Sequence, residues 1–426
     1  MPNTLLGVDY LKSKLSLRST RVDLRYRYYD QKEEIEDFRI STPEKLRFIN
    51  FVLGWCTKAV DTLADRLVFD GFDPDPNRIS EIYELNNADI LYHSAILSAL
   101  ISSCCFICIS EGTDGMPEMR VIDGANATGI IDETTCLLKE GYAILERDPV
   151  TNFPVIEAYF TPDYTYVTNR GVISTIPNPT GHPLLVPIIF KPDAKRPFGH
   201  SRISRACMDI IQAAMRTAKR SEITAEFYSF PQRWITGLDN PADFPKWEAT
   251  ISSFLRLGTS EDGEKPSLGQ FSQMSMEPHI TQFRMFAAMF AGETGLTLDD
   301  LGFATENPSS AEAIKAAHEN LRLSARDAQR SFGVGFLNAG YLAACLRDRF
   351  PYERKAFRFT QPQWQPIFEP DAAMLSGIGD GMIKINQAVP EFFGQKNVER
   401  LTGITADESA GLPLFDEEEE EEDNGG

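Results

Sequence analysis

The sequence of 426 residues predicts an α+β protein in which helices and an antiparallel strand meander occupy successive stretches. From about residue 101 to 190, short runs rich in β-branched and aromatic residues alternate with Gly, Asp and Pro. Nine prolines between Pro149 and Pro197 exclude long helices there. Beyond residue 200, long stretches without Gly or Pro favour helices.

Composition and charge limit the class of protein. The chain is 42% hydrophobic, which is enough for packed cores, and its length suggests two or three domains. The formal charge is −20, and the eight acids of the run DEEEEEED at 416–423 leave about −12 for the rest. Tight nucleic-acid binders are normally basic, because Lys and Arg displace counterions from phosphates. Tight DNA binding is therefore disfavoured.

The cysteines predict a reducing compartment. Their number, seven, is odd, and the start MPNTLLGVDYLKSKL lacks the layout of a signal peptide, so disulfides are not expected. Cys104, Cys105 and Cys108 are close in sequence, but no second pair of ligands accompanies them and the nearest histidine is His93. We interpret the three as core residues and expect no metal and no cofactor.

The most apolar segment, 94–110, is too short for a membrane span and holds five serines. We expect a helix over about 88–100 that leads into a buried strand at 104–109, followed by the turn EGTDG and the strand MRVID.

The N-terminal part is expected to be an exposed leader followed by a helix at 42–67. Thr42 is a candidate N-cap, Pro43 would occupy the first helical position and Glu44 the first turn. The apolar face of this helix would consist of Leu46, Ile49, Leu53, Ala59 and Leu63.

The strands of the meander are expected where β-forming runs end in turn residues. These runs are 121–122, 127–131, 141–146, 156–160 and 164–168. A further strand near Pro187 is expected to lead through Gly199 into a long helix.

That helix, at 201–230, has Ser201 as a candidate cap and carries a basic stripe. At about 100° per residue, five cations fall within about a third of the circumference. They are Arg202, Arg205, Arg216, Lys219 and Arg220. The stripe, interrupted by Asp209, is either a solvated face with salt bridges to a neighbouring helix or a face toward phosphate or an acidic neighbouring subunit.

Strand, helix and loop signals alternate after it. We expect a short strand at 231–237, an amphipathic helix at 242–257, a helix at 278–291, a loop at 292–308 and a long helix at 309–347. Ser309 and Glu312 form a capping box for the last helix. Its glycines at 333, 335 and 340 predict a bend or close packing.

Catalytic signatures are weak. Glu264 separates the second glycine of 258–265 from Lys265, which rules out a phosphate-binding loop, and Gly333 and Gly335 lie in a helical pattern. The segment HENLR lacks the second histidine of a zinc protease, and no G-x-S-x-G occurs. We predict no catalytic residues and no enzyme, although an acidic hydrolase with paired carboxylates is an alternative.

Five segments occur in a characteristic order over most of the chain. They are YYD near the start, WCTKAVDTLADRLVFDGF at 55–72, VPIIFKPDAKRPFGHSRIS at 186–204, SEITAEFYSFPQRWITG at 221–237 and NPSSAEAIKAAHENL at 307–321. Through them the chain resembles the portal proteins of tailed bacteriophages, in the subfamily similar to that of the Bacillus phage SPP1. The short region after Arg347 and the acidic tail depart from the family pattern.

The resemblance implies a portal-protein fold that assembles as a ring. Its implied parts are a wing of helices and strand meander (1–200), a stem helix (201–230), a small α/β clip (231–277), a second stem helix (278–291), a tunnel loop (292–308), a long helix (309–347), a wing return (348–375), a small helical crown (376–415) and a disordered acidic tail (416–426).

The resemblance also implies a function in the virion. It implies a dodecameric ring at one capsid vertex, assembled in the host cytoplasm, as the conduit for packaging and ejection of double-stranded DNA. The implied partners are the terminase large subunit, a head-tail adaptor, the major capsid protein, a scaffolding protein and DNA without sequence specificity, with no membrane. Another phage structural or adaptor protein without a DNA channel is an alternative.

Candidate contact residues follow from the same resemblance. For the tunnel loop they are Thr294, Thr297, Asp299, Asp300, Thr305 and Asn307, and for clip contacts with adaptor or motor they are Arg233, Trp234, Asp239, Asp243 and Lys246. A conduit must let a polyanion slide, so we expect the basic stripe to pair across subunits or to face the lumen. The acidic tail is expected to be solvated, or else to repel DNA or recruit a basic partner.

Overall fold

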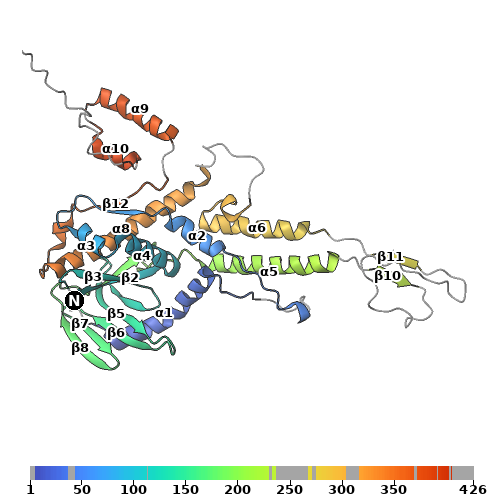
Figure 1. Ribbon diagram of the computed structural model, residues 1–426, viewed down its shortest axis with the longest axis horizontal. Helices are drawn as coiled ribbons and strands as arrows, with labels where there is room; N and C mark the ends of the chain where they lie inside the picture. The colour runs from blue at the N-terminus through green and yellow to red at the C-terminus, as the bar shows by residue number, and fades with distance from the viewer. Residues whose placement is uncertain are drawn as a thin grey trace, which may run out of the picture.

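The computed structural model places helices and antiparallel sheets around one large core (Figure 1). It describes residues 5–36, 44–112, 114–229, 233–236, 267–270, 275–303, 316–368, 372–390, 392–402 and 404. The strand pairs in these ranges are antiparallel, which confirms the predicted α+β class.

The predicted meander is a five-stranded sheet with its strands in chain order, β4-β5-β6-β7-β8. Its strands are β4 (Ala127–Ile131), β5 (Leu138–Arg147), β6 (Pro154–Phe160), β7 (Tyr164–Asn169) and β8 (Val172–Pro177). Short polar turns join them: the Asp148 carboxylate accepts hydrogen bonds from the backbone N–H of Val150 at 2.9 Å and of Thr151 at 2.7 Å. The edge strand β8 was not predicted, because VISTIP has no apolar-polar alternation.

A second sheet lies at the centre of the core, in the order β3-β2-β9. It consists of β2 (Cys104–Glu111), β3 (Pro117–Ile122) and β9 (Leu185–Ile189), and helices α4 (Ala88–Ser102) and α8 (Glu319–Arg347) pack against it. The predicted passage from helix to buried strand is confirmed. Cys104, Cys105 and Cys108 are free thiols buried in β2, so they fill the core as interpreted.

Helix α8 packs closely because its glycines lack side chains. A Cβ at Gly335 would lie 2.7 Å from Ile188 Cδ1, and one at Gly340 would lie 3.0 Å from Ile79 Cδ1. Ile79 begins α3 (Ile79–Leu85). The predicted close packing is thus confirmed, and it explains why glycine is placed where it costs helix stability.

The N-terminal leader is a helix, α1 (Val8–Tyr29), so the prediction of an exposed leader was wrong. Its apolar stripe is narrow, and only Leu11, Leu15, Val22 and Tyr28 are buried. The buried carboxylate of Glu140 in β5 accepts the backbone N–H of Leu6 at 2.8 Å, just before the helix begins. This stabilising contact comes from a distant strand and leaves no local sequence signal.

For the helix expected at 42–67, the predicted start was also wrong. The structure has a 3-10 turn, η1 (Glu44–Leu46), and then α2 (Trp55–Ala64). Gly54 precedes α2, where its low helix propensity favours a boundary. Thr42 and Pro43 lie outside the described residues.

Distant segments close the core. Strand β1 (Phe69–Phe72) pairs with β12 (Pro362–Trp364), and the rings of Phe69 and Trp364 are 4.8 Å apart. A 3-10 turn, η4 (Arg354–Phe357), lies between α8 and β12. Helices α9 (Ala372–Ala388) and α10 (Gln395–Thr402) follow and stand apart from this core (Figure 1). No helix in the described ranges is both long and apolar enough to cross a bilayer.

Candidate functional site: the projecting helix pair

Two helices project together from the body, α5 (Arg205–Ser229) and α6 (Glu277–Thr294) (Figure 1). Beyond their far ends lie β10 (Arg233–Thr236) and β11 (Ser267–Gln270), which pair with each other antiparallel. The structure confirms the predicted helix at 278–291 and the predicted strand over 233–236. Strand β11 was not predicted, since SLGQ has few β-formers.

The entry into α5 corrects the predicted start at Ser201. Gly199 has φ +73, and a Cβ there would lie 2.0 Å from the carbonyl oxygen of Phe190, so only glycine fits the turn after β9. The Ser201 hydroxyl donates to the carbonyl of Ile101 at 2.6 Å, which holds it in the turn. Ser204 acts as the cap instead, because its hydroxyl accepts the backbone N–H of Cys207 at 3.1 Å.

The base of the helix pair is anchored by aromatic packing. The Trp55 ring of α2 lies 5.3 Å from the ring of Phe283 and 5.6 Å from that of Phe290, both in α6. Phe290 is fully buried, and the Ser204 hydroxyl donates to Glu293 at 2.8 Å. The pair is therefore joined to the body at one end.

Between Phe283 and Phe290, α6 also exposes apolar side chains on another face. Met285 and Met289, four residues apart and hence on one face, are 48% and 50% exposed. The edge strand β8 does the same, with Val172 72% and Ile173 66% exposed. Exposed apolar faces and unpaired apolar edge strands are typical of surfaces that contact another chain.

The predicted basic stripe is not a continuous surface. Arg202 precedes α5 and is buried; its Nε donates to the carbonyl of Ala59 at 3.2 Å, and burial lowers its pKa to about 10. Lys219 is also buried, and its Nζ donates to the carbonyl of Arg47 at 3.1 Å. These two cations hold distant segments together, which corrects their assignment to a surface stripe.

The other three members are more accessible. Arg205 is exposed and lies 3.8 Å from Asp209 in the same helix. Arg216 is half-buried and donates to the carbonyl of Glu36 at 3.2 Å. Arg220 is half-buried as well.

Sequence reasoning missed a polar residue of α5, Gln212. It is buried, its Nε2 donates to Tyr28 Oη at 3.1 Å, and its Oε1 accepts the backbone N–H of Glu36 at 2.9 Å. These bonds connect α5 to the end of α1 and the segment after it. No motif around Gln212 signals this role.

The segment expected as a tunnel loop is partly ordered as helix. Helix α6 continues to Thr294 and ends at Gly295 with φ 71, and a 3-10 turn, η3 (Asp299–Leu301), follows. Thr294 is buried and its hydroxyl donates to Phe290 O at 2.7 Å, which removes it from the candidates for a channel surface. Residues 304–308, including the candidates Thr305 and Asn307, lie outside the described residues.

Thr297 and Asp300 cap this short turn reciprocally. The Thr297 N–H and hydroxyl both donate to Asp300 Oδ2 at 2.9 Å, and the Asp300 N–H donates to Thr297 Oγ1 at 3.2 Å. Asp299 is exposed. Of the described candidates, Asp299 is the one whose side chain is most accessible.

Other candidates fall on the far end of the helix pair or outside the described residues. Arg233 and Trp234 belong to β10, opposite Gln270 and Gly269 of β11. Asp239, Asp243 and Lys246, with the helix predicted at 242–257, lie outside the described residues, as do Ser309 and Glu312 of the capping box. The long helix ends at Arg347 as predicted.

No metal-binding constellation occurs in the part of the chain that the structure describes. There, no three His, Cys, Asp or Glu side chains are grouped so that they could hold an ion. His318 Nδ1 lies 3.9 Å from Asp300 Oδ2, as an isolated pair.

No protein-family model matches the chain, but curated relatives do. The portal protein of Mycobacterium phage L5 is 25% identical over 319 residues, which is 69% of this chain and 65% of that protein. The portal protein of Mycobacterium phage D29 is 25% identical over 339 residues, 74% of this chain and 69% of that protein. The match thus spans slightly less than two thirds of the L5 protein. These relatives confirm the resemblance to tailed-phage portal proteins, without singling out the SPP1-like subfamily.

The likeness to solved structures is weaker. A chain of the "Neck of empty GTA particle computed with C6 symmetry" is 13% identical, with a TM-score of 0.45, over 88% of this chain and 96% of that chain. A chain of the "Neck of native GTA particle computed with C12 symmetry" is 13% identical, with a TM-score of 0.43, over 83% of this chain and 90% of that chain. Here GTA denotes a gene transfer agent.

Proposed function

We propose that this chain is the portal protein of a tailed bacteriophage, one subunit of a closed ring at a capsid vertex of the virion. The ring, with twelve copies, would be the conduit for packaging and ejection of double-stranded DNA and would have a structural rather than a catalytic role. The observation that carries the proposal is the 25% identity to two curated portal proteins over 69% and 74% of the chain.

Two exposed apolar surfaces support ring assembly. A closed ring needs heterologous contacts, in which one face of each subunit meets a different face of the next. The Met285–Met289 face of α6 and the edge strand β8 belong to different elements, and both expose apolar side chains. We propose that contacts between neighbouring subunits cover them.

The parts of the subunit follow the order of the elements. The body, 1–200 with 348–375, would be the wing, and the pairing of β1 with β12 supports including the second stretch. Helices α5 and α6 would be the stem, 231–277 the clip, 292–308 the tunnel loop, 309–347 the long helix and 376–415 the crown. The clip, whose described strands β10 and β11 lie beyond the far end of the helix pair, would contact the terminase large subunit and then the head-tail adaptor.

Charge supports passage of DNA without tight binding. The chain carries a net charge of −20, so its ring as a whole would repel a polyanion. Contacts to phosphate would therefore be few, and the DNA could slide through. Because Arg202 and Lys219 are buried, the candidates for pairing across subunits or facing the lumen are Arg205, Arg216 and Arg220. Because Thr294 is buried, the candidates in the tunnel loop are Thr297, Asp299, Asp300, Thr305 and Asn307.

Assembly tests this proposal. Native mass spectrometry and negative-stain electron microscopy of the purified chain should show perforated rings with a mass of about twelve times 47.7 kDa. Met285→Asp with Met289→Asp should prevent ring formation, because charges replace the apolar contact. The control Val150→Asp changes a residue that is 90% exposed at the β5–β6 turn and should leave the rings intact.

A chain that stays monomeric at all concentrations would contradict the proposal. It would favour instead another phage structural or adaptor protein without a DNA channel. Rings that persist in the Met285→Asp, Met289→Asp variant would retain the portal assignment but exclude this face of α6 from the interface.

A further inference from the structure

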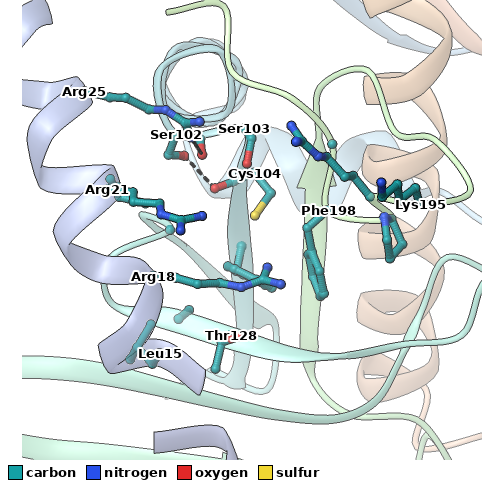
Figure 2. Close-up of a pocket in the computed structure, with 17 residues that line it drawn as sticks. Leu15, Arg18, Arg21, Arg25, Ser102, Ser103, Cys104, Thr128, Lys195 and Phe198 are labelled. Atoms are coloured by element: carbon teal, nitrogen blue, oxygen red, sulfur yellow. Dashed lines mark hydrogen bonds between the residues drawn. The ribbon is translucent and has the colours of Figure 1, made fainter. Parts of the chain in front are cut away.

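A cationic cavity of about 280 Å³ opens between α1 and the loop that follows β9 (Figure 2). Its walls carry Arg18, Arg21 and Arg25 from α1 and Lys195 and Arg196 from the loop. Figure 2 shows the α1 arginines extending from the helix toward the start of β2 and the Phe198 side of the cavity. None of the described residues that line it is Asp or Glu. In a chain of net charge −20, five cations around one cavity are not a consequence of composition.

Two of these cations have no carboxylate partner among the residues that the structure describes. Arg18 and Arg21 are exposed, and neither makes an ion pair with a residue that the structure describes. Arg18 lies over the Phe198 ring at 5.8 Å, and Arg25 donates to the carbonyl of Ser102 at 2.9 Å. Uncharged groups therefore hold these guanidinium groups in place and leave their charge available to a ligand.

Burial and neighbouring cations together lower the pKa of two groups at or near the cavity. Burial, followed by the charge of Arg18, lowers the pKa of Lys14 to about 8. Burial also lowers the pKa of Arg25, with Arg21 and Arg196 adding to the decrease. A cavity whose cations repel one another is stabilised by an anion that enters it.

The same sequence contains a matching polyanion, the run of eight carboxylates at 416–423, which lies outside the described residues. Residues 405–415 separate it from Ile404, a length of chain that spans roughly 40 Å when extended. A tether raises the effective concentration of a ligand when it can span the distance to the site.

Carboxylates suit this cavity better than the phosphates of a duplex. Phosphates of double-stranded DNA lie on a stiff, wide rod, whereas the cavity is a small recess whose walls include Ser102, Cys104 and Phe106. Side-chain carboxylates of a single peptide can enter such a recess and form bidentate pairs with guanidinium groups.

We propose that the acidic run at 416–423, from the same chain or from a second copy, binds in this cavity through its carboxylates, paired with Arg18, Arg21 and Lys195. The contact fastens the C-terminal end of the chain to the α1 side of the body. It does not depend on the proposed portal function, and it holds equally in a monomer or in a ring.

Carbodiimide cross-linking of the full chain tests the contact, because this reagent joins a carboxylate to an amine in contact with it by an amide bond. Peptide mass spectrometry should find Lys195 linked to the acidic run. Arg18→Glu with Arg21→Glu should lower the yield of this link about tenfold, since both cations become repulsive. The matched control, Arg326→Glu with Arg330→Glu, changes two exposed arginines of α8 by the same charge and should leave the yield unchanged.

A mixture of ¹⁵N-labelled and unlabelled chains distinguishes the two sources of the run. If every cross-linked pair of peptides carries a single isotope, the run comes from the same chain. If some pairs combine both isotopes, the run comes from a second copy. Both results support the proposal.

A second variant leaves the cavity itself unchanged by replacing Glu with Gln at all six positions from 417 to 422. If the run covers Lys195, this variant should increase acetylation of Lys195 about tenfold.

Four results would overturn the proposal. The first three are no Lys195 link in the parent chain, an equal yield in the Arg18→Glu, Arg21→Glu variant, and acetylation of Lys195 that is the same in the Gln variant as in the parent. A short DNA duplex that protects Lys195 equally in parent and Gln variant would assign the cavity to phosphate instead, and would also overturn it.

Discussion

The body and the projecting helix pair bury their apolar residues to different degrees. In the body, α8 has fully buried Phe332 and Phe336, and the central β2 is apolar on both faces. In the pair, α6 is anchored by Phe290 at its base yet exposes about half of Met285 and Met289. The body therefore holds itself together through its own core, whereas the pair has an apolar face that is left exposed by the residues that the structure describes.

The largest effect on stability is expected in the body. Phe336→Ala removes a fully buried ring that lies 5.0 Å from Phe69 and 4.9 Å from Tyr92, and should lower the free energy of unfolding by about 3–5 kcal/mol. Urea unfolding followed by circular dichroism measures this. Leu17→Ala, at a residue 78% exposed, is the control and should change it by less than about 0.5 kcal/mol. A loss below about 1 kcal/mol for Phe336→Ala would show that this core is not closely packed.

A smaller effect is expected where the two regions meet. Trp55→Ala removes the contacts of the Trp55 ring with Phe283 and Phe290 between α2 and α6. It should lower the free energy of unfolding by about 3 kcal/mol. Hydrogen exchange should show faster exchange of α6 amides, with those of β2 less affected, because the pair loses its anchor. Equal loss of protection in α6 and β2 would mean that the pair and the body unfold as one unit.

The contribution of Lys14 to the pH dependence of the free energy of unfolding should be smaller again. Its pKa in the folded chain is about 8, below the ordinary 10.5, so between these values the unfolded chain binds more protons and stability should rise with pH. Lys14→Met should remove a rise on the order of 1 kcal/mol, allowing for screening by solvent. The groups that act on Lys14 besides burial are Arg18, which lowers its pKa, and Cys104 and Glu140, which raise it. Unfolding of parent and variant at pH 7.5 and 9.5 provides the comparison, and identical slopes would contradict it.

The smallest effect on the isolated chain is expected on the exposed face of the pair. Met285→Ser with Met289→Ser should change the free energy of unfolding of the monomer by less than about 0.5 kcal/mol for each residue. The same variant should fail to form rings by native mass spectrometry, because the neighbour loses its apolar contact. A large loss of monomer stability would instead place these side chains in the chain's own core.

Prediction from the sequence succeeded where local signals were strong. The strands at 127–131, 156–160 and 164–168 end in Gly, Asp or Pro turns, and the structure has them at β4, β6 and β7. Prediction from the sequence failed for α1, because its few apolar residues alternate with arginines and other polar residues and give no clear helical pattern. It also failed for the start of α2. The order of motifs indicated the portal resemblance, which the mycobacteriophage relatives confirm.

The amino-acid sequence by itself was enough to predict most of the helices and strands in order and the net negative charge, because side-chain periodicity and turn residues act over a few neighbouring positions. The tertiary structure alone decided which cations are exposed. Arg202 and Lys219 are buried, and the carbonyls of Ala59 and Arg47, more than a hundred residues away, accept hydrogen bonds from them. Arg18 and Arg21 are exposed instead, and none of the described residues that line the cavity beside them is a carboxylate. Hydrogen bonds and ion pairs of this kind form between segments that meet only on folding, so no local pattern records them.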